Sequence, residues 1–205
     1  MSVHAKLRGL YAITDTHLIP RERFVETVEA AVRGGATMIQ LRLKDVDARE
    51  LVLIARSLVE TVSAPVIVND RADIALAAGA AGVHVGVDDI PAAALRKVVP
   101  ADFIIGASVG SDDEVKWSAG ADYVGIGPVY ATSSKPDAGD AIGIAEFVRL
   151  ARLTGLPAVA IGGIDTANCR DTLGAGAHGI AVIRAIFSAA DPERAARALS
   201  SASGS

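Results

Sequence analysis

Short apolar runs alternate with longer amphipathic stretches along the whole chain. The stretches at 21–34 and 48–60 repeat apolar residues at helical spacing, which predicts helices. The apolar runs have the length of buried strands and lie at 7–14, 36–43, 65–69, 82–85, 102–108, 122–127, 157–162 and 179–183. Eight strands that alternate with helices predict a single α/β domain, a (β/α)8 barrel with a parallel sheet.

The entry to each strand follows a weak internal repeat. Gly-Ala turns precede the second, fourth, sixth and eighth strands, at 34, 78, 119 and 175, whereas Pro65, Pro100 and Pro157 precede the third, fifth and seventh. Glycine at such a position can adopt the left-handed conformation that ends a helix. The repeat favours the barrel, and an open doubly wound sheet stays the alternative because it also alternates strands and helices.

Composition narrows the class of protein further. The 205 residues predict one domain over 1–205, with 200–205 as a tail. With 51% hydrophobic and only 4% aromatic residues, the core must consist of Ala, Val, Ile and Leu, which suits parallel strands covered on both faces. The net charge of −4, without a basic stripe, argues against nucleic-acid binding. No membrane span is expected, and the single Cys169 fits a reducing cytoplasm.

Polar residues gather where the predicted strands end, which is the face that carries ligands in a barrel. Gln40, Arg42 and Lys44 alternate with leucines, so we expect their side chains to share one face. Arginine binds phosphate bidentately and lysine acts as a point charge, so this face could neutralise an anion. The alternative is a strand edge with solvated charges.

Carboxylates follow two neighbouring strands. Asn69 and Asp70 end one strand and Asp89 follows the next, and together they predict a site for Mg²⁺ bound to a substrate phosphate. The alternative is that Asp70 and the pair Asp88–Asp89 cap the helices that follow them.

Two further loops are candidate phosphate sites. The connection 128–142 is long and contains Thr132, Ser133, Ser134 and Lys135, which predicts an anion clamp and lid, with a solvent loop as the alternative. The seventh and eighth strands end in Gly162–Gly163 and Ile183–Arg184 before helices, as in barrels that bind phosphate there.

Two enzyme motifs are matched only in part. The segment 106–110 fits G-x-S-x-G, and Asp165 and His178 follow in the order of a hydrolase. His178, however, precedes the last strand and is expected at the opposite end of the barrel from Ser108. Gly125-Ile126-Gly127 lacks the third glycine of a dinucleotide fingerprint. We therefore reject the dinucleotide fingerprint and do not favour the hydrolase.

Taken in order, the motifs resemble the thiamin phosphate synthases and their TenI-like relatives over nearly the whole chain. They are LYAITD, GGATMIQLRLKD, VIVNDRADIALAAGAAGVHVG, DDIP, IIGAS, GADYVGIGPVYATSSK, AIGGI and GIAVIRAI. The resemblance implies transfer of a hydroxymethylpyrimidine group from its diphosphate to a thiazole phosphate, with pyrophosphate released. A thiazole nitrogen needs no deprotonation, so the lack of a convincing nucleophile in the sequence agrees with this chemistry.

The resemblance also implies a role for each candidate residue. Gln40 and His84 would lie by the pyrimidine, Asp70 and Asp89 would hold Mg²⁺, and Thr132, Gly163 and the backbone after Ile183 would bind the thiazole phosphate. From the loop and strand-end patterns above, Ser134, Ile183 and Arg184 are also expected to contact substrate. The diphosphate would contact Arg42, Lys44, Asn69, Ser108 and Lys135, of which all but Asn69 would also act in catalysis. The expected partners are small-molecule substrates, with no nucleic acid and no membrane, and a homodimer is compatible with the sequence.

Two positions depart from the family pattern. Val87 stands where relatives often have Gln, and Arg184 stands where many have Ser. Arg184 could add a charged phosphate contact or point to solvent. The alternatives to a synthase are a TenI-like thiazole tautomerase, which would lack most of the diphosphate-binding residues, and a non-catalytic sensor of phosphorylated ligands on the same barrel.

Overall fold

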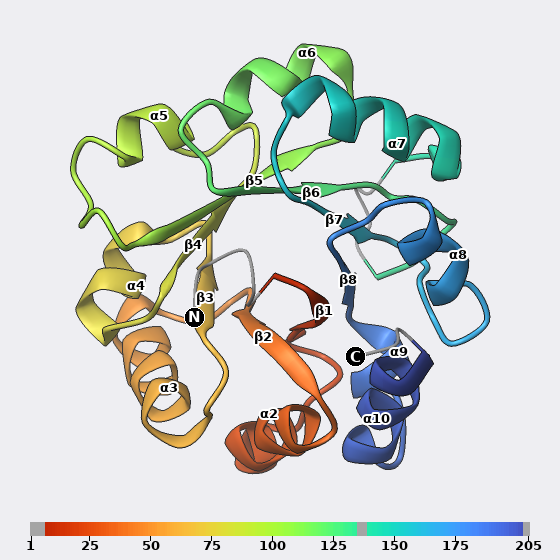
Figure 1. Ribbon diagram of the computed structural model, residues 1–205. Helices are drawn as coiled ribbons and strands as arrows, with labels where there is room; N and C mark the ends of the chain where they lie inside the picture. Colours follow the sequence, from red (N-terminus) through yellow and green to blue (C-terminus); the bar gives the residue numbers. More distant parts are fainter. Residues whose placement is uncertain (1–6, 135–138, 203–205) are drawn as a thin grey trace.

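A computed structural model describes residues 7–134 and 139–202, which form a closed barrel of eight parallel strands with helices outside it (Figure 1). The strands are β1 Gly9–Ile13, β2 Ala36–Leu41, β3 Val66–Asn69, β4 Gly82–Val85, β5 Ile104–Val109, β6 Tyr123–Ile126, β7 Ala158–Ile161 and β8 Gly179–Val182. Each strand pairs with the next, and β1 pairs with β8 to close the ring. The predicted (β/α)8 barrel is confirmed, and the open doubly wound sheet is wrong.

Helices follow every strand. They are η1 Arg21–Arg23, α2 Phe24–Arg33, α3 Ala48–Thr61, α4 Ala72–Ala78, α5 Ala92–Leu95, α6 Asp112–Val115, η2 Lys116–Ser118, α7 Gly143–Thr154, α8 Cys169–Gly174, α9 Arg184–Phe187 and α10 Pro192–Ala202. Both helices predicted from periodicity are present. Residues 200–202 of the expected tail belong to helix α10, which continues to Ala202. No helix of the described ranges combines the length and apolarity that crossing a membrane requires.

The strands are buried on both faces and separate two apolar layers. Their outward side chains pack against the helices and form the larger core, which includes Leu10, Ile39 and Val124. Their inward side chains fill the barrel with a smaller cluster that includes Met38, Ile67 and Tyr123. This double burial explains why the strand segments read as continuous apolar runs.

The predicted glycine turns have the backbone conformation that the repeat implied. Gly35, Gly79, Gly120 and Gly176 precede the four even strands, and all four have positive φ angles. Residues other than glycine rarely adopt this backbone conformation. Glycine at these turns therefore lets each helix end and the chain enter the next strand.

Candidate active site

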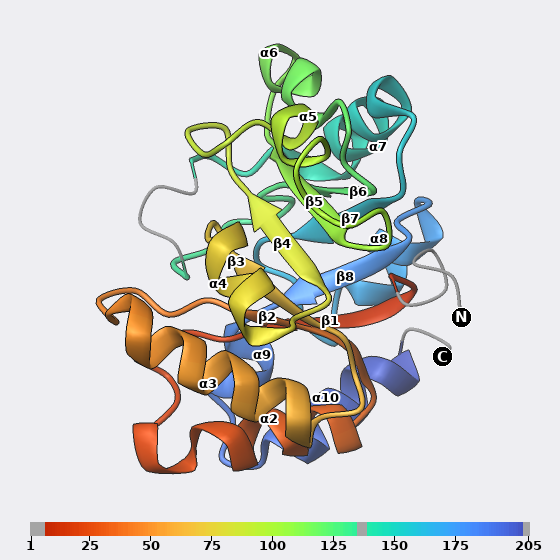
Figure 2. The same cartoon turned by 90° about the vertical axis from the view of Figure 1, so that its left-hand side faces the viewer.

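The carboxyl ends of the strands surround a cavity of about 1040 Å³. Figure 2 shows the barrel from the side, with β4 running toward this end. The cavity collects every predicted site residue that the structure describes: Gln40, Arg42, Lys44, Asn69, Asp70, His84, Asp89, Ser108, Thr132, Ser134, Gly163, Ile183 and Arg184. Lys135 lies outside the described residues. Residues from seven of the strand ends and their loops thus meet at one place.

Two threonines from the loop after β1 hold the cationic end of β2. The backbone N–H of Arg42 donates to Thr14 Oγ1 at 2.9 Å, and that of Lys44 donates to Thr16 Oγ1 at 2.8 Å. Each threonine hydroxyl donates in turn to the carbonyl of the same residue. These side chains continue the β1–β2 pairing beyond the strands, so Arg42 and Lys44 keep the alternate spacing that the sequence predicted.

The Arg42 side chain has an acidic neighbour. Its Nη1 lies 3.5 Å from Asp15 Oδ2, and the two side chains are only 11% and 14% exposed. An ion pair with this much burial is less screened by water than one on the surface. Asp15 therefore restricts where the guanidinium points while leaving most of its five N–H donors for a ligand.

Asp70 and Asp89 line the cavity from neighbouring strand ends. Asp70 follows β3 directly with a φ of 62°, a conformation that is unfavourable for a residue other than glycine and that is frequent at functional sites. The Asp89 carboxylate accepts the Gly86 N–H at 2.7 Å through Oδ2, which fixes the loop after β4. The helices α4 and α5 have Arg71 and Pro91 as their N-caps, so neither aspartate is in the capping position of the alternative interpretation.

This set of donors fits Mg²⁺ better than a transition metal. Within the described residues no group of three or more His, Cys, Asp or Glu side chains could enclose a metal ion. Mg²⁺ needs no such group, since it binds to one or two carboxylates and completes its shell with water and substrate phosphate. Asp70 and Asp89 could supply the two carboxylates, because both line the cavity that would hold the phosphate.

Ser108 has a histidine partner, but a different one from the hydrolase motif. His178 precedes β8, and its backbone N–H donates to the carbonyl of Ala158 at the start of β7. It therefore lies at the amino end of the strands, opposite to the carboxyl end where Ser108 lies. The partner is His84 of β4, whose Nε2 lies 3.0 Å from Ser108 Oγ. The other ring nitrogen, Nδ1, lies 3.1 Å from the Tyr123 hydroxyl, whereas a catalytic triad would have a carboxylate there.

Tyr11 and Tyr123 are cavity residues that the sequence analysis missed. Their hydroxyls lie 2.9 Å apart inside the barrel, and the Gln40 amide donates to Tyr11 at 3.1 Å. Burial raises the pKa of both phenols, so both stay protonated and neutral in the physiological range. The alternation of residues along a strand could have revealed them, because it turns both tyrosine side chains toward the inside of the barrel. A hydroxyl buried there needs a hydrogen-bond partner.

On the other side of the cavity, glycines expose the backbone of the loops. The loop after β6 packs on the loop after β7 through hydrogen bonds from Val129 to Ile161 and from Tyr130 to Gly162. A Cβ on Gly163 would lie 2.5 Å from the Ala131 carbonyl oxygen, so only glycine fits there. The Gly163 carbonyl accepts from Asn168 Nδ2 at 2.9 Å, while its N–H makes no hydrogen bond to any other described residue. That N–H can therefore donate to an anion.

Arg184 is the first residue of α9 and lines the cavity as an exposed side chain. No ion pair with another residue of the described ranges holds its guanidinium. The contact with a ligand therefore stays a prediction.

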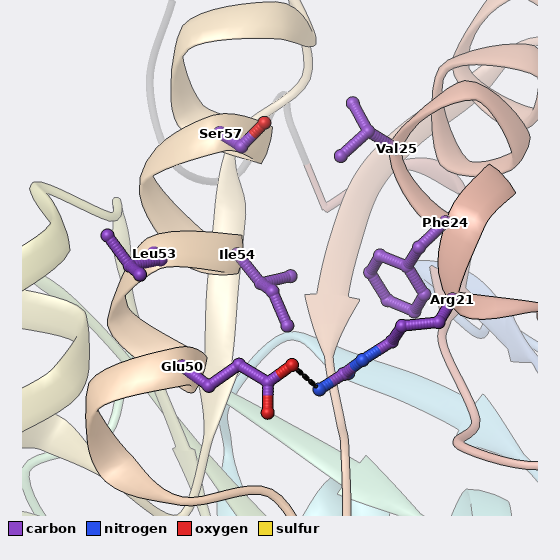
Figure 3. A pocket seen from close by; sticks show the side chains of 7 residues that line it. All are labelled: Arg21, Phe24, Val25, Glu50, Leu53, Ile54 and Ser57. Carbon is purple, nitrogen blue, oxygen red and sulfur yellow. Dashed lines mark ion pairs between the residues drawn. The ribbon is translucent and has the colours of Figure 1, made fainter.

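A second hollow, of about 330 Å³, lies on the outside of the barrel between α2 and α3 (Figure 3). Its lining is mostly apolar, with Phe24 and Ile54 among its side chains. Arg21 and Glu50 face each other across it as an ion pair and neutralise one another. It lacks the convergence of many polar and charged side chains found in the cavity at the strand ends, which is therefore the candidate active site.

A closed barrel with a polar cavity at the carboxyl ends of its strands defines a (β/α)8-barrel enzyme. The family model for thiamine monophosphate synthase matches residues 10–186, so the chain belongs to that family, and it is a transferase. A thiamine-phosphate synthase of Xanthobacter autotrophicus is 48% identical over 198 residues and covers 94% of both chains. One from a Roseiflexus strain is 46% identical over 93% of this chain and 83% of its own.

A solved structure agrees with this assignment. A thiamine phosphate pyrophosphorylase from Pyrococcus furiosus superposes with a TM-score of 0.88 at 38% identity, covering 99% of this chain and 98% of its own. The resemblance found in the sequence is thereby confirmed at the level of family and fold.

Proposed function

We propose that this chain is a thiamin phosphate synthase. It would join 4-amino-5-hydroxymethyl-2-methylpyrimidine diphosphate to 4-methyl-5-(2-hydroxyethyl)thiazole phosphate and release pyrophosphate. The observation that carries the proposal is that one cavity brings together Arg42, Lys44, Asp70, Asp89 and Ser108 with the glycine-containing loops after β6 and β7. The names of the relatives at 46–48% identity support the same activity.

The proposed reaction is a substitution at the hydroxymethyl carbon. The bond from this carbon to the diphosphate oxygen breaks first, and its electron pair leaves with the diphosphate. The thiazole nitrogen then forms the new carbon–nitrogen bond with its own lone pair, so no proton has to be removed. The enzyme's main task is to stabilise the negative charge that develops on the leaving group.

Arg42, Lys44 and Ser108 would donate hydrogen bonds to the leaving diphosphate, together with Asn69 and Lys135. Gln40 and His84 would orient the pyrimidine beside them. Asp70 and Asp89 would hold Mg²⁺, which supplies further positive charge to the diphosphate when bound. Support for this arrangement comes from the largely buried Arg42–Asp15 pair, which holds a cation at the cavity, and from the two aspartates on neighbouring strand ends.

The thiazole phosphate would bind at the loops after β6, β7 and β8. Thr132 and Ser134 offer hydroxyls, Gly163 offers its backbone N–H, and Ile183 and Arg184 begin α9 beside them. We place the reaction in the cytoplasm, with these two small molecules as its substrates.

The test is to supply both substrates with Mg²⁺ and to measure pyrophosphate and thiamin phosphate together. We expect both products in equal amounts, and neither product when one substrate is omitted or the metal is chelated. Isomerisation of a thiazole phosphate without pyrophosphate release would instead identify a TenI-like tautomerase. Binding without turnover of either kind would identify a sensor.

A further inference from the structure

A continuous row of side-chain hydrogen bonds lies along the wall of the cavity, because all five residues that form it line the cavity. It runs from Gln40 Nε2 to the Tyr11 hydroxyl (3.1 Å), on to the Tyr123 hydroxyl (2.9 Å), to His84 Nδ1 (3.1 Å), and from His84 Nε2 to Ser108 Oγ (3.0 Å). All four distances lie within the ordinary range for hydrogen bonds. The row joins four strands, β1, β2, β4 and β6, to the serine at the end of β5.

The Gln40 amide, at one end of the row, decides which group donates in each hydrogen bond. An amide nitrogen can only donate, so Tyr11 accepts from Gln40. Tyr11 is 3% exposed, and its own hydroxyl hydrogen has only Tyr123 to receive it among the described residues. Leaving a buried donor without an acceptor costs about 1–3 kcal/mol. Tyr11 therefore donates to Tyr123, and Tyr123 donates to His84.

This direction decides the tautomer of His84. If Nδ1 accepts from Tyr123, a neutral imidazole carries its hydrogen on Nε2 and donates it to Ser108 Oγ. The Ser108 hydroxyl hydrogen is then left to point at a ligand. In a serine hydrolase the direction is opposite, because the serine donates to an unprotonated nitrogen that acts as general base.

Two glycines leave the space that the row occupies. A Cβ on Gly106 would lie 2.5 Å from His84 Nδ1 and would overlap the Tyr123 ring. A Cβ on Gly125 would lie 3.2 Å from His84 Cε1. Gly106 is the first glycine of the G-x-S-x-G match, so in this chain that glycine makes room for the His84–Tyr123 contact.

We propose that Tyr11 and Tyr123 are positioning residues: because the Gln40 end offers Tyr11 no acceptor, both hydroxyls donate toward His84, His84 donates to Ser108, and Ser108 is held as a hydrogen-bond donor to the leaving diphosphate. The inference rests on the proposed function only in its last clause, which places the diphosphate at Ser108. The direction of the row is a property of the protein alone and can be measured without any substrate.

The first experiment reads the tautomer by nitrogen NMR of histidine-labelled protein without ligand, at a pH where the imidazole is neutral. The His84 signals are assigned by their loss in His84→Gln. We expect the hydrogen on Nε2. We also expect Gln40→Glu to move it to Nδ1, because a carboxylate only accepts and reverses the row. Gln40→Met is the control, since it removes the amide without adding an acceptor and should keep the hydrogen on Nε2.

A hydrogen on Nδ1 in the unmodified protein would overturn the proposal, as would an Nε2 hydrogen that persists in folded Gln40→Glu.

The second experiment measures the affinity for pyrophosphate with Mg²⁺. Tyr123→Phe should weaken it by roughly fivefold, the effect of one hydrogen bond, and should have no such effect in a Ser108→Ala background.

Equal losses in both backgrounds would show that Tyr123 acts independently of Ser108 and would overturn the positioning role. Failure of the unmodified protein to bind pyrophosphate at all would count against the proposed function. The tautomer measurement would still decide the direction of the row.

Discussion

The two sides of the cavity are built in different ways. The side formed by β2 to β5 presents charged and polar side chains, including Arg42, Lys44, Asp70 and Asp89. The side formed by β6 to β8 presents hydroxyls, the Arg184 side chain and backbone made accessible by glycine, above all at Gly163. We call these the side-chain half and the backbone half.

The difference corresponds to two tasks. A departing diphosphate gains charge during the reaction, so it needs strong compensating charges, which side chains and a metal supply. A phosphate that only anchors a substrate keeps its charge throughout, and backbone N–H groups suffice to hold it. Changes in the side-chain half should therefore lower turnover, and changes in the backbone half should mainly weaken binding.

The largest effect is expected from the two aspartates. Asp70→Asn and Asp89→Asn keep the shape but remove a charge that the metal needs, so each should lower kcat/KM by about 100-fold or more. Steady-state pyrophosphate release measures this. Asp88→Asn is the matched control, because Asp88 lines the same cavity without being assigned to the metal. Near-normal activity of either variant, or equal losses in all three, would contradict the metal assignment.

Ser108→Ala tests the hydroxyl of the side-chain half. Loss of one hydrogen bond to a charged leaving group should cost about 1.5–3 kcal/mol, mainly in kcat. A fluorophosphonate probe should leave Ser108 unlabelled, since its histidine partner faces a tyrosine and not a carboxylate. Stoichiometric labelling of this serine would instead support a hydrolase.

Gly163→Ala tests the backbone half. The new methyl group would meet the Ala131 carbonyl and displace the loop, so we expect the KM for thiazole phosphate to rise about tenfold with a smaller change in kcat. Gly155→Ala is the control, because Gly155 has nearly the same φ, 64° against 63°, with no atom within 4 Å of its Cβ. It should lower stability by about 1 kcal/mol without changing that KM. A selective fall in kcat for Gly163→Ala would argue against the division into halves.

Arg184→Ser should have the smallest effect. If the guanidinium binds the thiazole phosphate, its loss removes a contact made equally in the bound substrate and the transition state. The KM for that substrate should then rise a few-fold, roughly 1 kcal/mol, with kcat unchanged. An unchanged KM would mean that Arg184 points to solvent and does not belong to the site.

The sequence predicted the fold well because double burial leaves a strong pattern. Eight apolar runs separated by helical stretches became eight strands, and the glycines before the even strands took positive φ angles. The ends of elements were less predictable: β1 covers Gly9–Ile13 within the expected 7–14, and α10 includes Ala202.

Only those site residues were predicted that stand out in a short stretch of sequence. Strand ends revealed Arg42 and Asp70, because charges that follow an apolar run are visible in the sequence. The partner of Ser108 was not visible, since His84 reaches it across the neighbouring strands β4 and β5. Tyr11 and Tyr123, 112 positions apart, could be paired only after the barrel closed.

The most direct test of this division is a crystal structure with Mg²⁺, pyrophosphate and thiazole phosphate bound together. The account predicts the metal on Asp70 and Asp89, with pyrophosphate on Arg42, Lys44 and Ser108. It predicts the thiazole phosphate on the N–H groups of Gly163 and of the start of α9. Pyrophosphate bound at Gly163, or a metal that contacts neither aspartate, would contradict it.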